Sequence, residues 1–544
     1  MRNEVKDTKA SLWISASAGT GKTKNLIDRI LALLLNGTEP SHILCLTYTK
    51  AAAGEMLDRL SKYLNHWQQL SDSEVINELI EMGFSENHLP RVRELYKQSL
   101  EKEWVNIRTI HSFGMNLLKK FPLETGLYPG AKLCDDNQKK QMLEDSFNFV
   151  LNQKELRNDL KNIAQYTSSI LDLIKDNTFI KVRRFFDKYE NYKSIRKFFA
   201  DEFDIDQGLL DMDQEKALQK IKSKIFGENF QNHFAELADI LSFGNKTDQN
   251  KASYLKKSAE LGGDDFISAV MTKELTPTKN LCTKKVETTK LKSDLLNLQN
   301  NTLTYLDEKR KLIATKINIS FFVVLNTLIK KFVERKIDKH LIDYDDVIIS
   351  TLELLQNNLS WVFYKIDRNI NHILVDEAQD TSPEQWEIIR RLTSEFFAHE
   401  HSEKTIFVVG DEKQSIYSFQ GANVELFEKM HEKFHKDSVN CAQMFYDVEL
   451  NKSYRSDGNI LKFVDKVFEN DFEKIKHDTV KNSDTGVVEI VDLFEKSDDD
   501  PENSLAEYIA NFVESSIKNH VAVKDRSRAA HPEDFLILFR HRKI

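Results

Sequence analysis

The residues best suited to chemistry lie in one short stretch near the N-terminus, where small residues lead into Lys22 and Thr23. The apolar segment 12–14 predicts a buried strand, and the apolar spacing after Lys22 predicts an amphipathic helix. Backbone N–H groups at a helix start, aided by the helix dipole, bind anions such as phosphate. Lys22 is therefore expected to contact the β- and γ-phosphates of a nucleotide, and the Thr23 hydroxyl to bind Mg²⁺. The expected phosphate-binding residues are Ala16, Ser17, Ala18, Gly19, Thr20, Gly21, Lys22 and Thr23.

A pair of acids follows a second apolar segment, 373–375. In an enzyme that hydrolyses nucleotides, Asp376 would hold Mg²⁺ through water, and Glu377 would orient and deprotonate the attacking water. The alternative interpretation is a helix N-cap within the segment 380–383, which is compatible with the first. Two adjacent acids after a buried strand favour the phosphate site, although Ala16 stands where a P-loop usually has glycine.

Two further residues are candidates for the γ-phosphate. Gln414 follows the predicted strand 405–410, and Arg455 would supply a second cation. A surface salt bridge is the alternative interpretation of Arg455. Tyr417 is an aromatic residue on a predicted loop, where it is suited to stacking on nucleic-acid bases.

Thr47 and His111 lie where two more predicted strands, 43–46 and 105–109, end. The carboxyl ends of strands in an α/β sheet form its ligand-binding edge, so these side chains are candidates for binding. The alternative interpretations are local: Thr49 would cap the next helix, and a lone histidine is usually structural.

The elements that position these residues belong to a long, helix-rich chain. Its 544 residues are 40% hydrophobic and 30% charged, with only 17 Gly and 8 Pro, which indicates three or four domains. The net charge of −9 gives no global basic signature, so a nucleic-acid partner would need a local groove. The four cysteines are far apart and are typical of reduced, buried thiols in a cytoplasmic protein. We find no signal peptide and no run of apolar residues long enough for a membrane span.

Residues 135–335 carry no catalytic motif and are predicted to form a helical insertion. Basic and aromatic residues interleave over 181–199, which suits single-stranded nucleic acid. The same residues also fit a core helix with a solvated basic face, and that interpretation is favoured. A second basic run is likewise interpreted as a solvated face: Lys330, Lys331, Arg335, Lys336 and Lys339.

Together these residues resemble the UvrD/Rep-type superfamily 1 DNA helicases, and within them the AddA-like branch related to RecB. Seven motifs occur in the order found in that family. They are Ser-Ala-Ser-Ala-Gly-Thr-Gly-Lys-Thr at 15–23, Leu-Thr-Tyr-Thr-Lys-Ala-Ala at 46–52, Thr-Ile-His-Ser-Phe at 109–113, Asp-Tyr-Asp-Asp at 343–346, Val-Asp-Glu-Ala-Gln-Asp at 375–380, Val-Gly-Asp-Glu-Lys-Gln-Ser-Ile-Tyr at 409–417 and Ser-Tyr-Arg-Ser at 453–456.

The resemblance implies an α/β fold: a P-loop NTPase core of RecA type, with a parallel sheet and a large helical insertion. Residues 1–134 and 336–447 would form the two parts of the first RecA-like domain, interrupted by the insertion at 135–335. Residues 448–544 would begin a second RecA-like domain that is truncated, with strands at 486–491 and 534–540. The family's later motifs and a C-terminal nuclease domain are not found, so the chain is expected to be the N-terminal portion of a longer helicase. It could be a fragment, a split gene's first half or a frameshifted product.

The resemblance also implies an activity: ATP-dependent 3′–5′ translocation on DNA and unwinding in the repair of double-strand breaks. ATP and Mg²⁺ would be served by Lys22, Thr23, Asp376, Glu377, Gln414 and Arg455. Single-stranded or double-stranded DNA would be contacted at Thr47, His111 and Tyr417. An AddB-like protein is the expected partner, in the cytoplasm and without a membrane.

Two alternatives remain open from the sequence. The chain could be a catalytically impaired fragment that binds ATP and DNA without unwinding, because the later motifs include an arginine for the transferred phosphate. It could also be a P-loop ATPase that acts on a protein partner, against which the motifs around His111 and Tyr417 argue.

Overall fold

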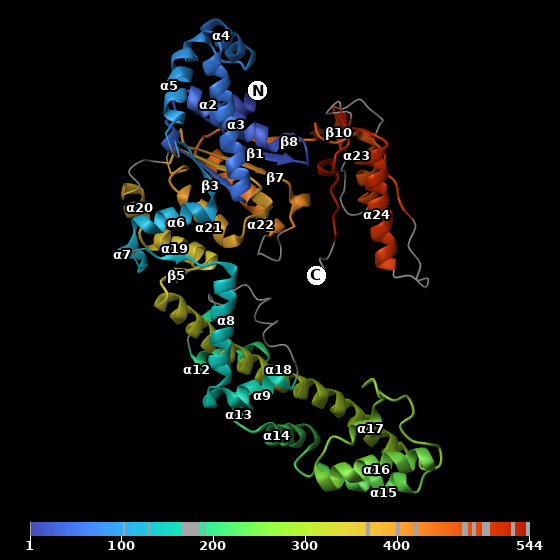
Figure 1. Ribbon diagram of the computed structural model, residues 1–544. Helices are drawn as coiled ribbons and strands as arrows, with labels where there is room; N and C mark the ends of the chain where they lie inside the picture. The colour runs from blue at the N-terminus through green and yellow to red at the C-terminus, as the bar shows by residue number, and fades with distance from the viewer. Residues whose placement is uncertain are drawn as a thin grey trace. The chain divides into compact units, whose positions relative to one another are not determined.

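Figure 1 shows the computed structural model of the chain. The chain comprises two units, which are described separately. Unit 1 comprises Met1–Ala16 and Lys22–Leu450, and unit 2 comprises Ser17–Gly21 and Asn451–Ile544. The described residues are 2–101, 104–128, 130–165, 185–186, 188–189, 191–365, 370–398, 403–416, 423–469, 477–480, 486–491, 501–523 and 528–539.

Unit 1 is built on a six-stranded sheet in the order β3-β2-β6-β7-β1-β8, with every neighbouring pair parallel. The strands are β1 Ser11–Ala16, β2 Ile43–Thr47, β3 Asn106–Thr109, β6 His372–Val375, β7 Thr405–Gly410 and β8 Phe445–Leu450. β2, β6 and β7 are buried at every residue, as expected for parallel strands covered on both faces. The predicted α/β class with a parallel sheet is confirmed.

Helices cover both faces of this sheet, and side-chain alternation along β1 separates the two cores. Leu12 and Ile14 belong to one hydrophobic cluster and Trp13 to the other, as the period of two in a strand requires. On the Leu12 face pack α2 Lys22–Leu35, α3 Lys50–Gln69, α4 Asp72–Glu81 and α5 Leu89–Ser99. On the Trp13 face pack α6 Ile110–Lys120, α19 Tyr344–Asn357, α21 Pro383–Leu392 and α22 Val424–Asn440.

The segment between α6 and α19 is mainly helical and is organised along α18, a helix of 50 residues over Thr289–Asp338 (Figure 1). By length and composition alone α18 could cross a membrane, which differs from the expectation that no apolar run is long enough. In this structure helices pack along it, and Val324, Leu328 and Phe332 are completely or almost completely buried. The helices that contact α18 are α8 Asp136–Leu151, α9 Arg157–Ala164, α12 Tyr192–Glu202, α13 Gln207–Leu210, α14 Gln214–Phe226 and α17 Ile267–Val270. Two other helices, α15 Phe230–Ser242 and α16 Lys246–Leu261, pack against each other.

The basic and aromatic run at 181–199 lies partly in the core beside α18. Phe186, Ile195 and Phe199 are buried, and Phe185 packs against Phe322 with ring centroids 4.5 Å apart. For the described part of the run, this supports a core helix rather than a stacking surface for nucleic acid.

Unit 2 consists of helices and short strand pairs in its described part. Its elements are β9 Lys452–Ser453, α23 Gly458–Val467, β10 Asp478–Thr479, α24 Pro501–Lys518, β11 Ala522–Val523 and β12 Arg528–Ala529. The prediction of strands at 486–491 and 534–540 is wrong for the described residues, because Val487 and Leu538 are 82% exposed in irregular backbone. No described strand pairs with either segment, and an extended segment without a neighbour has no ladder of hydrogen bonds to stabilise it. Arg540 lies outside the described residues.

The four cysteines are free thiols, as predicted, but only two of them are buried. Cys45 and Cys134 are buried, whereas Cys282 and Cys441 are partly exposed.

A buried arginine joins the N-terminal segment to the sheet. Arg29 of α2 is completely buried and donates hydrogen bonds to the carbonyl oxygens of Asp7 and Ala10, at 2.5 and 2.7 Å. It also donates a hydrogen bond to Thr405 Oγ1 at 3.1 Å. The same Thr405 Oγ1 lies 2.8 Å from His372 Nδ1. Burial, with a contribution from the Arg29 charge, lowers the pKa of His372 from 6.5 to about 3.

This lowered pKa predicts a loss of stability in acid. Below pH 6.5 the unfolded chain binds a proton at His372, but the folded chain does not until about pH 3, so stability falls as the pH drops through that range. The variant His372→Gln removes this contribution, and its free energy of unfolding should fall less steeply, by about 1 kcal/mol per pH unit. Urea denaturation of the whole chain between pH 7 and pH 5 measures the slope. The exposed His233→Gln is the control, and equal slopes in all three proteins would contradict the prediction.

Candidate functional site

The loop Ser17–Gly21 has the backbone conformation that its glycines allow. Gly19 and Gly21 have φ angles of +76° and +92°, in the left-handed region that glycine adopts without steric cost. Thr20 Oγ1 donates to the Ser17 carbonyl oxygen at 2.7 Å and closes the turn. Lys22 and Thr23 then begin α2, so the predicted strand, small-residue loop and helix follow one another as expected.

Within unit 2, this loop contacts the segment that carries Arg455. The Tyr454 N–H donates to the Gly19 carbonyl oxygen at 2.8 Å. A Cβ atom added to Gly19 would lie 2.7 Å from Arg455 Cβ and 2.9 Å from Ser453 Oγ. Two predicted site residues, Gly19 and Arg455, are therefore neighbours although they are far apart in the sequence.

Within unit 1, Lys22 contacts the predicted catalytic acid. Lys22 Nζ lies 3.1 Å from Glu377 Oε2, and the lysine side chain is only 10% exposed. Glu377 has φ +47° and ψ +45°, a left-handed conformation that costs about 1–3 kcal/mol in a residue other than glycine. Asp376, just before it, is buried, and its N–H donates to the Leu46 carbonyl oxygen at 2.9 Å.

The charges at the end of β6 fit a divalent cation. Burial, and then the neighbouring Glu377 charge, raise the pKa of Asp376 to about 7. The described residues contain no cluster of three His, Cys, Asp or Glu side chains that could hold a metal ion alone. Mg²⁺ usually binds one or two carboxylates together with substrate phosphates, and the buried Asp376 carboxylate fits that mode.

Gln379 connects the acid to the next strand. Its Nε2 donates to Glu377 Oε2 at 2.8 Å, and its Oε1 accepts the Asp411 N–H at 2.9 Å. Gln414, in the 3-10 helix Glu412–Gln414 after β7, donates from Nε2 to Asp411 Oδ2. The structure thus brings Gln414 and Glu377 into one chain of hydrogen bonds. The sequence placed Gln379 at the strand end but did not identify this bridge.

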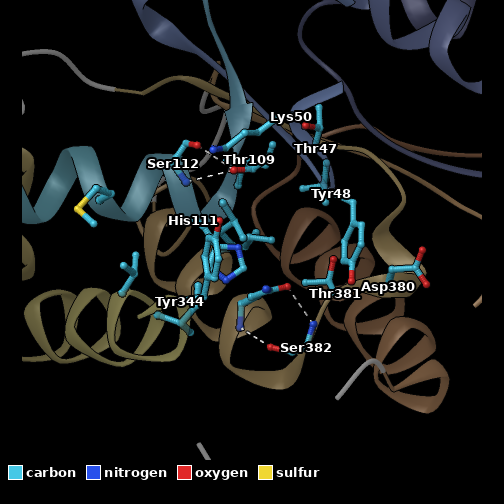
Figure 2. Close-up of a pocket in the computed structure, with 18 of the residues that line it drawn as sticks. Thr47, Tyr48, Lys50, Thr109, His111, Ser112, Tyr344, Asp380, Thr381 and Ser382 are labelled. Atoms are coloured by element: carbon cyan, nitrogen blue, oxygen red, sulfur yellow. Dashed lines mark hydrogen bonds between the residues drawn. The ribbon is translucent and has the colours of Figure 1, made fainter. Parts of the chain in front are cut away.

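A cleft of about 770 Å³ opens beside these residues, at the carboxyl ends of β2, β3 and β6 (Figure 2). Thr47 and His111, the two described candidates for DNA contact, both line it. Asp376 lines it as well, so the cleft adjoins the Lys22–Glu377 pair. Thr47 Oγ1 donates to the Thr49 carbonyl oxygen at 3.0 Å, and Thr49 caps α3, as its local interpretation predicted.

The cleft also contains residues that the sequence analysis did not select. Tyr48 and Lys50 follow Thr47, and Tyr344 packs edge-on against His111 with ring centroids 5.1 Å apart (Figure 2). Burial lowers the pKa of His111 to about 4, so its ring is neutral at pH 7. Both tyrosines belong to family motifs, Tyr48 to 46–52 and Tyr344 to 343–346. Their place in a motif is the signal that could have identified them. Tyr417, the remaining candidate, lies outside the described residues.

The helix that follows the acids is capped within the segment 380–383, as the alternative interpretation predicted. Ser382 is the N-cap of α21, and it accepts a hydrogen bond from the Gln385 N–H at 3.3 Å. Asp380 instead lines the cleft, and burial raises its pKa to about 6.

Known proteins match this chain over most of its length. The family profile of the UvrD/REP helicase N-terminal domain matches residues 1–435. An ATP-dependent helicase/nuclease subunit of Lactobacillus johnsonii is 25% identical, over 85% of this chain and 39% of that protein. The protein of the same name from Clostridium botulinum is 26% identical, over 85% of this chain and 38% of that protein. The chain therefore spans about two fifths of the length of these curated relatives.

The geometry of Gly19 predicts that even a methyl group there disrupts the loop. In Gly19→Ala the side chain meets Arg455 Cβ and Ser453 Oγ, and an L-residue at φ +76° is strained. ATP affinity, measured with a fluorescent analogue, should fall about tenfold or more. Gly54→Ala is the matched control, because a Cβ atom at Gly54 of α3 has nothing within 4 Å. Unchanged ATP affinity in Gly19→Ala would show that the loop does not bind phosphate.

Proposed function

The chain belongs to the UvrD/REP helicase family, and from that premise we propose that it is the motor part of an AddA-type ATP-dependent helicase/nuclease. It hydrolyses ATP and moves 3′ to 5′ along single-stranded DNA, which unwinds duplex DNA during the repair of double-strand breaks. One observation carries the proposal: Asp376 stands beside the Lys22–Glu377 pair and also lines the cleft of Thr47 and His111.

ATP is the proposed nucleotide, held by the residues 16–23. Lys22 exchanges its contact with Glu377 for the γ-phosphate, which frees the carboxylate to orient and deprotonate the attacking water. Thr23 and Asp376 would hold Mg²⁺, which would neutralise phosphate charge there. Arg455, beside Gly19 in unit 2, supplies the second cation, and Gln414 senses the γ-phosphate.

Single-stranded DNA is the proposed occupant of the cleft. Tyr48 and the Tyr344–His111 pair offer aromatic surfaces on which bases stack, and Lys50 offers a cation for the backbone. The neutral His111 ring contributes a hydrogen bond or a stacking face rather than a charge. A chain of hydrogen bonds runs from Glu377 through Gln379 and Asp411 to Gln414. This chain couples the binding and hydrolysis of ATP at Glu377 to the residues that follow β7.

The partner is proposed to be an AddB-like protein, and the location the cytoplasm. Each of the two relatives is named for being one subunit of a helicase/nuclease, which supports a complex with at least one other chain.

Steady-state ATP hydrolysis, with and without single-stranded DNA, tests this proposal. Wild-type turnover should be stimulated by DNA, and Glu377→Gln should lower kcat by about 100-fold or more while ATP still binds. Lys22→Ala should lose ATP affinity as well. Glu353→Gln, an exposed acid on α19, is the matched control and should keep wild-type rates. Bound ATP with no turnover in the wild type would contradict a motor function for this chain.

Tyr48 tests the cleft as the strand site. Tyr48→Ala should weaken binding of a short single-stranded oligonucleotide about 5- to 100-fold, because a stacking surface is lost. Tyr48→Phe keeps the ring and should bind nearly as the wild type does. Fluorescence anisotropy measures the affinity, and Tyr254→Ala on α16 is the control. The DNA site lies elsewhere if Tyr48→Ala binds normally.

A further inference from the structure

A cluster of charged side chains lies where α18 returns to the sheet domain. Lys336, near the end of α18, has a side chain only 5% exposed, so the solvated face predicted for this basic run is wrong at Lys336. Its Nζ lies 3.0 Å from Asp343 Oδ2 and also contacts Asp346 Oδ2. A buried ammonium group is stable only when paired in this way, so the contact fixes where α18 ends.

The two aspartates that Lys336 binds form the cap of α19. Asp343 Oδ1 accepts the Asp346 N–H at 2.9 Å, and Asp346 Oδ2 accepts the Asp343 N–H at 3.1 Å. This reciprocal capping box sets the first turn of α19, which carries Tyr344 and Asp345. Lys336 therefore holds both carboxylates of the turn that forms one wall of the cleft.

A second lysine reaches the same turn from α8. Lys139 Nζ lies 3.4 Å from Asp345 Oδ2 and 3.5 Å from Asp343 Oδ2. Lys132–Leu133 (β4) pairs with Leu341–Ile342 (β5) at this junction, so the chain leaves and re-enters the sheet domain beside the cluster. Both lysines come from the helical segment between α6 and α19.

The charge balance of this wall bears on any strand in the cleft. Tyr344 is 44% exposed, and Tyr344 and Asp345 both line the cleft, so the charge of this turn acts on any ligand of the cleft. Lys139 and Lys336 place positive charge against the three carboxylates of this turn, of which Asp345 lines the cleft. Like charges placed together at an interface are strongly unfavourable, so the wall needs its cations before it can accept DNA.

We infer that Lys139 and Lys336 are positioning residues through which the helical insertion sets the affinity of the cleft for single-stranded DNA. They neutralise the aspartates of the α19 cap and hold Tyr344 against His111. This inference rests on the proposed function, and it adds that the insertion is a working part of the DNA site.

Lys336→Met keeps the length of the side chain and removes its charge. Affinity for a short single-stranded oligonucleotide should fall about tenfold, and the DNA concentration for half-maximal ATP hydrolysis should rise by the same factor. The KM for ATP and the rate without DNA should not change. The double variant Lys336→Met with Asp346→Asn restores the balance of charge and should recover most of the lost affinity. Lys330→Met, an exposed lysine on the same helix, is the matched control.

The outcomes separate the inference from the proposed function. Thermal unfolding is measured beside affinity, and a lower melting temperature with unchanged affinity would overturn the inference, since Lys336 would then only stabilise the fold. If Lys336→Met does not fold, the partly exposed Lys139→Met carries the same expectation, and wild-type affinity in it would overturn the inference. A wild-type protein that binds no single-stranded DNA would overturn the proposed function and this inference together.

Discussion

All six strands of the sheet run parallel, so their carboxyl ends meet at one edge, and the residues that follow those strands are brought together there. Thr47 ends β2, Thr109 ends β3, Asp376 follows β6 and Asp411 follows β7. The side-by-side order of β2, β6 and β7 is what places Asp376 next to Leu46 and Gln379 next to Asp411. The cleft, and the position of the acid pair beside it, are both consequences of this single constraint.

Opposite charges are paired at that edge of the sheet. Lys22 and Glu377 neutralise each other, while Asp376 keeps a proton more readily than an ordinary aspartic acid because it is buried. The left-handed backbone of Glu377 is maintained by its contacts with Lys22 and Gln379. A phosphate and a divalent cation together would complete the electrostatics of such a site, and this is the physical argument for a nucleotide there.

The helical insertion has its own hydrophobic cores along α18, yet its ends are tied to the functional edge. Lys139 and Lys336 reach the α19 cap from two different helices. A segment that only enlarged the protein would not need a buried cation beside the cleft wall. Through these lysines, charges of the insertion act directly on the aspartates at the cleft wall.

Several strands, one loop and one helix cap of this protein could be predicted from its sequence, because interactions between near neighbours determine them. Apolar runs predicted β1, β2, β6 and β7, the glycines at 19 and 21 predicted a tight loop, and Thr49 predicted a helix cap, because each depends on near neighbours in the chain. The same reasoning failed for 486–491, where apolar residues form no strand in the absence of a described partner. A strand is stabilised by the chain beside it, and sequence pattern alone does not say whether that neighbour exists.

The sequence by itself determined which residue types could bind phosphate and activate water: Lys22, Thr23, Asp376 and Glu377 follow apolar segments at motif spacing. Only the tertiary structure decided which of them touch, that Gln379 bridges Glu377 to Asp411, and that Lys336 is buried against Asp343 rather than solvated. The physical reason is that these contacts depend on the order of the strands in the sheet and on where α18 ends beside the sheet domain. Contacts between residues hundreds of positions apart depend on which elements pack side by side, and no local periodicity carries that information.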